Sequence, residues 1–437
     1  MTVHVIGAGL AGCEAAWQLA NAGISVKLYE MKPQKYSPAH KYEGFAELVC
    51  SNSLKAMRVE SAAGLLKEEM RMLGSVIMQC ADECSVPAGG ALAVDRVKFS
   101  DAVTSKIRNH KNIEIISGEV TQIPDGYVII ATGPLTSDAF AEVIRVKCGE
   151  ETLSFYDAAA PIVSFESIDK DKVFFAARYD RGDSDYINCP MDKEQYEAFL
   201  HELTQAESVE LKSFERGFTV YEGCMPIEVL AKRGHDAIRY GPLKPVGLRD
   251  PYTGRRPWAV AQLRKENRDG TMYNLVGFQT NLKFGEQKRI FSMIPGLEHA
   301  QFVRYGVMHR NTFLDSPRLL DSTFRLKSDP RIFFAGQITG VEGYIESASS
   351  GIVAGRNLSR ILAGREPVTF PKETMIGALC AYISDKSVRE FQPMGSNMGI
   401  LPPLEERIKN KQDRYAALSE RSLGLLRQIL EKERMPE

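Results

Sequence analysis

Two cysteines stand in sequence surroundings that suit thiol chemistry. Cys224 lies two residues before Pro226, in a segment that ends at Gly234. Proline favours the first helical position and glycine often follows a helix end, so Cys224 is expected at or just before a helix N-terminus. Free N–H groups there favour the nucleophilic thiolate, although a buried structural thiol is the alternative. By its spacing alone, Cys50 in the polar turn LVCSNS is an ordinary buried cysteine.

Length and composition limit the class of protein. A chain of 437 residues is too long for one ordinary core, so two domains are expected. The chain is 44% hydrophobic and 25% charged, which is typical of a soluble globular protein. A formal net charge of -1 means that any nucleic-acid-binding surface must be local. No signal peptide or membrane-spanning run is visible, so a cytoplasmic protein without a membrane partner is expected.

Eight cysteines are spread along the chain, and in a reducing compartment they are expected to be thiols. Cys80 and Cys84 have no matching cysteine or histidine pair nearby, so no metal site is expected. Each cysteine is therefore either a small core residue or a reactive thiol.

The element that would position such chemistry begins at the N-terminus. An apolar run at residues 3–6 leads into a glycine turn, a helical pattern follows through Leu19, and a second apolar run at residues 24–29 ends at Glu30. This order and spacing match the dinucleotide-binding fingerprint, in which pyrophosphate rests on a helix N-terminus and the acid accepts ribose hydroxyls. The predicted contacts are Gly7, Ala8, Gly9, Leu10, Ala11, Gly12 and Glu30.

Two later segments favour FAD over NAD. Residues 127–134 form an apolar run that ends in the turn ATGP at Gly133, and they resemble a motif of flavin-binding proteins of the glutathione-reductase-like class. Residues 331–344 run from an apolar strand into a glycine-rich turn, and residues 347–357 then predict a helix rich in small residues. Its N-terminus could stabilise negative charge on a reduced flavin. The predicted contacts here are Gly336, Gln337, Gly343, Tyr344 and Gly351.

Because the first and last thirds would both contact FAD, the sequence predicts an α/β fold with a discontinuous Rossmann-like FAD-binding domain. Residues 1–165 would form its first part, and residues 311–437 its second part with C-terminal helices. Residues 166–310 would form an inserted mixed α/β domain, since short apolar runs alternate there with Gly/Pro turns.

Within that insertion, residues 232–269 are locally basic and aromatic. Such a stretch suits an RNA surface that tracks phosphates and stacks bases, but composition alone favours a solvated charged face. The residues are Lys232, Arg233, Arg239, Lys244, Arg249, Arg255, Arg256, Arg264, Lys265 and Arg268, with Tyr240, Tyr252 and Trp258 among them.

Over almost its whole length the chain resembles the folate- and FAD-dependent tRNA (uracil-5-)-methyltransferases of bacteria. The resemblance rests on long blocks rather than on the glycine motif. They are VIGAGLAGCEAAWQLA at residues 5–20, FAELVCSNSLK at 45–55, DECSVPAGGALAVDR at 82–96, YDAAAPIV at 156–163, YEGCMPIEVLAKRG at 221–234, VRYGVMHRN at 303–311 and FFAGQITGVEGYIESASSG at 333–351.

This resemblance implies that the methylene of 5,10-methylenetetrahydrofolate is transferred to C5 of a T-loop uridine in tRNA and reduced to methyl by reduced flavin, with NADPH or NADH as reductant. It implies that Cys224 adds to C6 of the uracil and that Cys50 acts beside the flavin. His309 is a candidate for contact with the folate pterin, and Tyr344 is its rival. No stable protein partner is expected.

Two other activities remain open at this stage. The same chemistry on ribosomal RNA would use the same cofactor blocks. A plain NAD(P)H-dependent flavin oxidoreductase with a small-molecule substrate would be expected to carry a second nucleotide motif or a CxxC pair, and neither is visible.

Overall fold

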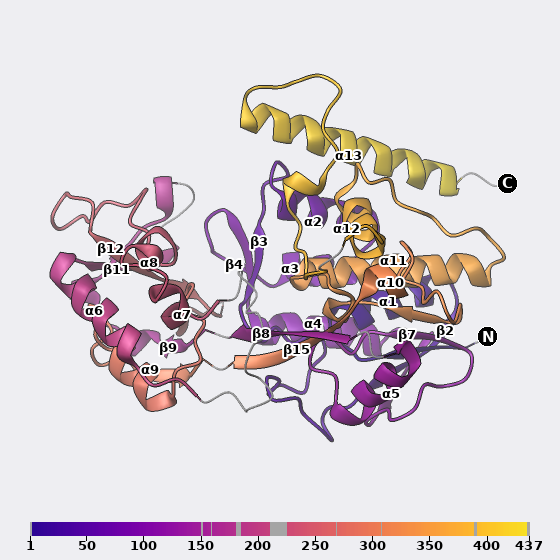
Figure 1. Ribbon diagram of the computed structural model, residues 1–437, viewed down its shortest axis with the longest axis horizontal. Coiled ribbons are helices and arrows are strands. Elements are labelled where there is room, and N and C mark those ends of the chain that lie inside the picture. Colours follow the sequence, from indigo (N-terminus) through magenta and orange to yellow (C-terminus); the bar gives the residue numbers. More distant parts are fainter. Residues whose placement is uncertain are drawn as a thin grey trace.

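The structure is a computed structural model that describes residues 2–149, 152–158, 160–180, 185–209, 225–267, 269–306, 308–388 and 391–434. These residues form two lobes with separate hydrophobic cores (Figure 1). The larger lobe is built from both ends of the chain, and the smaller one from its middle. This is the discontinuous α/β arrangement that the sequence predicts.

A parallel five-stranded sheet lies at the centre of the larger lobe. Its strand order is β16-β7-β1-β2-β6, so the glycine-motif strand β1 is the middle strand. Strands such as β7 are almost wholly apolar, as expected for a parallel sheet inside the core. The strands are β1 Thr2–Ile6, β2 Ser25–Glu30, β6 Ile113–Ser117, β7 Tyr127–Ile130 and β16 Ile332–Phe334.

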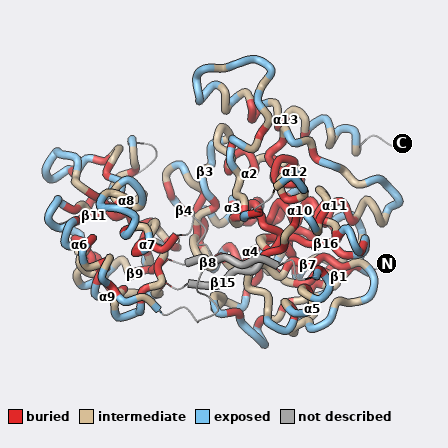
Figure 2. Tube along the Cα trace, in the orientation of Figure 1, coloured by how far each residue is buried: buried red, intermediate tan, exposed pale blue. Residues whose placement is uncertain are grey.

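The larger of the two hydrophobic cores lies in this lobe, and Figure 2 shows its buried residues around α10, α11 and α12. Helix α11 starts at Tyr344, three residues before the predicted start, because Gly343 takes a φ of +120° at its N-cap. The helices are α1 Leu10–Asn21, α2 Ala62–Met72, α3 Val76–Glu83, α4 Arg96–Arg108, α5 Asp138–Cys148, α10 Ser316–Leu319, α11 Tyr344–Leu362, α12 Met375–Ser384 and α13 Lys411–Arg434.

The smaller lobe contains a six-stranded sheet in the order β10-β11-β12-β13-β9-β14, with antiparallel pairing throughout. Its strands are β9 Ile162–Ser164, β10 Phe174–Phe175, β11 Tyr186–Met191, β12 Ala259–Lys265, β13 Met272–Leu275 and β14 Phe302–Arg304. Its helices are α6 Lys193–Gln205, α7 Ile227–Ala231, α8 Ala237–Tyr240 and α9 Phe284–Phe291.

Two small sheets complete the fold. An antiparallel pair, β8 Thr152–Ala158 with β15 Met308–Leu314, carries the chain into and out of the smaller lobe (Figure 1). A three-stranded sheet of β3 Ser53–Ala56, β5 Ala91–Val94 and β4 Ser85–Val86 faces the smaller lobe. Among the described residues, none of the helices is both long and apolar enough to cross a bilayer.

Candidate dinucleotide and thiol site

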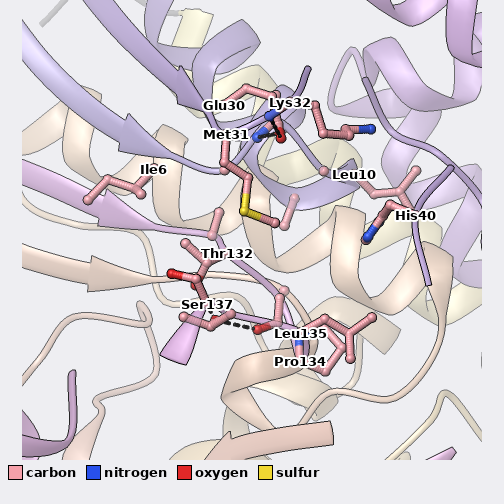
Figure 3. A pocket seen from close by; sticks show the side chains of 18 of the residues that line it. Ile6, Leu10, Glu30, Met31, Lys32, His40, Thr132, Pro134, Leu135 and Ser137 are labelled. Carbon is pink, nitrogen blue, oxygen red and sulfur yellow. Dashed lines mark hydrogen bonds between the residues drawn. The ribbon is translucent and has the colours of Figure 1, made fainter. Parts of the chain in front are cut away.

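A cavity opens at the carboxyl ends of the parallel strands, where open α/β sheets bind their ligands (Figure 3). It encloses about 1140 Å³, a volume that includes its opening to solvent. Residues from both ends of the chain line it, as expected if one ligand contacts the first and last thirds. The predicted contacts among the lining residues are Gly7, Ala8, Gly9, Leu10, Ala11, Glu30, Gly133, Gly336, Gln337 and Tyr344.

The first two motif glycines fit a phosphate-binding turn. Gly7 has a φ of +98°, and a Cβ on it would lie 2.6 Å from the carbonyl oxygen of Ala131. A Cβ on Gly9 would meet no atom within 4 Å, so the backbone there stays open towards the cavity. Because Gly9 is also the N-cap of α1, the free N–H groups of the first turn start at this point.

Three of the predicted glycines lie outside the cavity lining. A Cβ on Gly12 would lie 1.8 Å from the carbonyl oxygen of Gly7, and one on Gly351 would lie 2.1 Å from that of Ala11. These two glycines let α1 and α11 approach the motif backbone and each other. Gly343 permits the turn into α11. Their contribution to the cavity is therefore through packing.

Glu30 lies where the fingerprint places its acid. Its Oε2 accepts the backbone N–H of Ala8 at 2.9 Å, and its Oε1 accepts that of Lys32 at 3.0 Å. A carboxylate oxygen can accept a second hydrogen bond, so both oxygens can still receive ribose hydroxyls. The carboxylate thus ties the glycine turn to the end of β2.

Some lining residues were not predicted from the sequence. Lys32 and His40 follow β2 and face the cavity, and Gly118, Glu119 and Val120 follow β6. Gly118, Glu119 and Val120 could have been predicted from the sequence. The apolar run at β6 indicates another strand of the parallel sheet, and its carboxyl end lies at the same edge of that sheet as the end of β1. Lys32 donates from Nζ to the carbonyl oxygens of Tyr42 and Gly44, contacts that no local pattern indicates.

Cys50 and Tyr344 meet at the rim of this cavity. The Tyr344 hydroxyl oxygen lies 3.0 Å from Sγ of Cys50 and accepts the backbone N–H groups of Cys50 at 2.8 Å and Ser51 at 3.2 Å. Burial, and then the neighbouring Cys50, raises the pKa of Tyr344 well above its usual value. The phenol is therefore protonated at neutral pH and can donate its proton to the sulfur. Both Tyr344 and Val49, the neighbour of Cys50, line the cavity.

The other two predicted reactive residues are not described to the same extent. Cys224 lies outside the described residues. Its expected helix is present as α7, but it begins at Ile227 with Pro226 as N-cap and ends at Ala231, earlier than Gly234 suggested. The backbone of His309 pairs with that of Asp157 between β15 and β8, and the side chain of His309 lies outside the described part of the structure.

The basic stretch of the smaller lobe divides into different environments. Arg264 is buried at 7% exposure, which corrects its prediction as a surface residue. The guanidinium of Arg239 lies 3.8 Å above the ring centroid of Trp258. Tyr240 and Tyr252 are both 69% exposed. Two aromatic rings near basic residues are thus accessible, while the third, Trp258, is partly buried.

The fold and the cavity together define a class. Residues 2–366 match the family model described as Glucose inhibited division protein A. Two crystal forms of Aquifex aeolicus GidA share the fold, with TM-scores of 0.70 and 0.69 at 18% identity. They cover 99% and 98% of this chain, which in turn covers 76% and 78% of theirs.

Curated relatives narrow this class. The chain is 60% identical to the methylenetetrahydrofolate--tRNA-(uracil-5-)-methyltransferase TrmFO of Acetivibrio thermocellus, over 98% of this chain and 99% of the relative. It is 58% identical to the TrmFO of Ligilactobacillus salivarius and 57% identical to that of Bacillus licheniformis, with 98% of each chain covered. The chain therefore belongs to the TrmFO family within the wider GidA class.

Proposed function

We propose that this protein transfers the one-carbon unit of 5,10-methylenetetrahydrofolate to C5 of the T-loop uridine of tRNA, giving 5-methyluridine. The close relatives named for this activity support it over nearly the whole chain. The observation that carries the proposal is the Cys50–Tyr344 contact at the rim of a dinucleotide cavity. It supports a role for this thiol beside the expected flavin.

The residues around the cavity fit FAD. Gly7, Gly9 and the first turn of α1 would hold the pyrophosphate, and Glu30 would hold the adenosine ribose. Gly336 and Tyr344, which line the cavity from the last third of the chain, would face the flavin. When bound, FAD reduced by NADPH or NADH supplies the two electrons that turn a methylene into a methyl group.

The roles of the two cysteines follow from uracil chemistry, since C5 of uracil is a poor nucleophile. The Cys224 thiolate adds to C6, and the resulting enolate attacks the electrophilic methylene from C5. Loss of the C5 proton expels tetrahydrofolate and leaves an exocyclic methylene at C5 of the uracil. Hydride addition to that methylene gives the methyl group, and departure of the thiolate then restores the ring. Cys50 acts on the flavin side, where the Tyr344 hydroxyl and the two backbone N–H groups that it accepts fix the position of Sγ.

We also propose residues 1–165 and 311–437 as the FAD-binding domain and residues 166–310 as the domain that receives the RNA substrate. The separate hydrophobic cores of the two lobes support two such domains, although β9 Ile162–Ser164, just before the first boundary, pairs within the sheet of the smaller lobe. The β8–β15 pair joins the lobes, and the second boundary falls inside β15. A role for His309 in folate contact is retained, with Tyr344 as the rival.

Product mapping tests the proposed activity. Purified protein is incubated with methylenetetrahydrofolate, FAD and NADPH, and with tRNA and ribosomal RNA transcripts in separate reactions. The proposal predicts 5-methyluridine in the T loop of tRNA. Product in ribosomal RNA alone would establish the alternative RNA substrate, and NADPH oxidation without RNA methylation would indicate a plain flavin oxidoreductase.

Serine variants test the assignment of the two cysteines. RNA that contains 5-fluorouridine should trap the wild-type protein covalently and should also trap Cys50→Ser, because fluorine at C5 blocks release of the thiolate. Cys224→Ser should form no adduct. An adduct of normal yield with Cys224→Ser would overturn the assignment of the nucleophile.

A further inference from the structure

Three arginines from different parts of the chain surround the loop of residues 48–52, which we call the thiol loop. We propose that Arg304, together with Arg96 and Arg264, positions Cys50 and favours its thiolate form. This inference rests on the proposed place of Cys50 beside the flavin. The arginines are positioning residues, because their contacts to the loop are with its backbone and with polar neighbours of Cys50.

The first part of the argument is the peptide unit that joins Val49 to Cys50. Its carbonyl oxygen accepts from Nη2 of Arg304 at 2.7 Å and from Nη1 of Arg96 at 3.3 Å. Its N–H group, on the opposite side of the planar unit, donates to the Tyr344 hydroxyl at 2.8 Å. The peptide is thus held from both sides, which sets the direction of the Cys50 side chain.

The second part is the link from the thiol loop to the smaller lobe. Arg264, on β12, donates from Nε to Oδ1 of Asn52 at 3.0 Å and from Nη2 to Oγ of Ser51 at 2.7 Å. The Asn52 amide in turn donates to the carbonyl oxygen of Lys265 at 2.7 Å. The smaller lobe therefore contributes directly to the geometry of a thiol in the larger one.

The third part is the charge around Cys50. Three guanidinium groups lie near two carboxylates. Glu266 pairs with Arg96 and is 3% exposed, and the charge of Asp95 also acts on Glu266. Burial lowers the pKa of Arg304 to about 10, a value at which it is still protonated at neutral pH. Its charge acts on both Cys50 and Tyr344. Since Tyr344 is neutral there, the arginines outnumber the nearby negative charge, and cations near a thiol favour the thiolate.

Site-specific alkylation measures this effect without any turnover. FAD-saturated protein is treated with iodoacetamide between about pH 6 and about pH 10, and the tryptic peptide of residues 42–55 reports modification of Cys50. Arg304→Gln removes the charge, and Arg304→Lys keeps it. Arg178→Gln is the matched control. Arg178 is a partly buried arginine of the smaller lobe whose guanidinium contacts Gln262 and Val246 instead of the thiol loop.

Arg304→Gln should raise the midpoint of the Cys50 profile by about one pH unit, which slows alkylation near neutral pH about tenfold. Arg304→Lys should stay close to wild type, and so should Arg178→Gln. Glu266→Gln should move the midpoint in the opposite direction, because it removes the opposing negative charge. A clamp with only a structural role would not give opposite shifts.

Retained FAD and an unchanged thermal transition establish that each variant is folded. If Arg304→Gln does not fold, Arg304→Lys and Glu266→Gln provide the test. Equal midpoints in wild type and Arg304→Gln would overturn the inference. So would a wild-type Cys50 that stays protonated up to about pH 10. The profile needs neither folate nor RNA, so a protein that shows these shifts but makes no 5-methyluridine would refute the proposed function alone.

Discussion

The hydroxyl oxygen of Tyr344 lies 3.0 Å from Sγ of Cys50, although the two residues are 294 positions apart in the chain. Tyr344 is the first residue of α11, and Cys50 belongs to the thiol loop that follows the dinucleotide motif. The contact joins the two distant segments expected to enclose the flavin. It also makes the position of the thiol dependent on one phenol.

Tyr344→Phe should therefore disturb the thiol loop more than the loss of one oxygen suggests. The backbone N–H groups of Cys50 and Ser51 lose their acceptor, and an unpaired buried donor costs about 1–3 kcal/mol. We expect a lower midpoint of thermal unfolding and a 5-methyluridine yield reduced at least about tenfold, with FAD still bound. The measurements are calorimetry, product mapping and the visible absorbance of the protein.

Tyr382→Phe is the control for that experiment, because its hydroxyl donates to the carbonyl oxygen of Gln392, remote from the cavity. It should leave product formation unchanged. If Tyr344→Phe kept full activity, the phenol would have no part in placing Cys50.

Gly351→Ala should separate α1 from α11. The added Cβ would lie 2.1 Å from the carbonyl oxygen of Ala11, so the backbone must shift at the wall of the cavity. Overpacking of this kind costs about 1–3 kcal/mol, and we expect weaker FAD binding together with a lower unfolding temperature. Equilibrium titration with FAD and a thermal melt measure the two effects.

Gly424→Ala provides the matched comparison within α13, where a Cβ would meet no atom within 4 Å. Alanine is the better helix former by about 1 kcal/mol, so this variant should be slightly more stable and bind FAD normally. Unaltered FAD affinity in Gly351→Ala would show that FAD binding does not depend on the close approach of α11 to α1.

Glu69 should make stability depend on pH. Its carboxylate accepts the first N–H groups of α12, from Met375 and Ile376, yet burial raises its pKa from 4.5 to about 7. A raised folded-state pKa gives stability that is present below about pH 4.5 and is lost as the pH rises through about 7. In Glu69→Gln, the decrease of the unfolding temperature between these values should be smaller than in wild type.

Thermal melts across this pH window provide the measurement. Glu142→Gln is the control, since this glutamate pairs with Arg145 on the surface and the hydrogen bond from Arg145 lowers its pKa. An identical decrease in wild type and Glu69→Gln would show that Glu69 does not titrate in this range.

The sequence was sufficient for the features that depend on local spacing. Gly7, Gly9 and Glu30 fall within one strand–helix–strand unit, so their types and separation already specify the turn and the acid that meet at one end of the sheet. The apolar run of β7 likewise predicted a buried parallel strand, and that of β16 predicted a strand. Short-range patterns of this kind need no knowledge of tertiary contacts.

Contacts between distant segments were not predictable in this way. Arg264 counted as one of ten basic residues in a stretch, but β12 places it against Ser51 and Asn52 in the other lobe. Tyr344 was a candidate for folate contact, and no local pattern indicated that its hydroxyl meets Cys50. Only the folded arrangement of the two lobes brings these side chains together.

FAD binding tests the central claim most directly, because every proposed role depends on a flavin in the cavity at the end of β1. The purified protein should be yellow, or should take up FAD stoichiometrically in an equilibrium titration, and Gly351→Ala should bind it more weakly. A colourless protein that never binds FAD, even when refolded with it, would contradict the account.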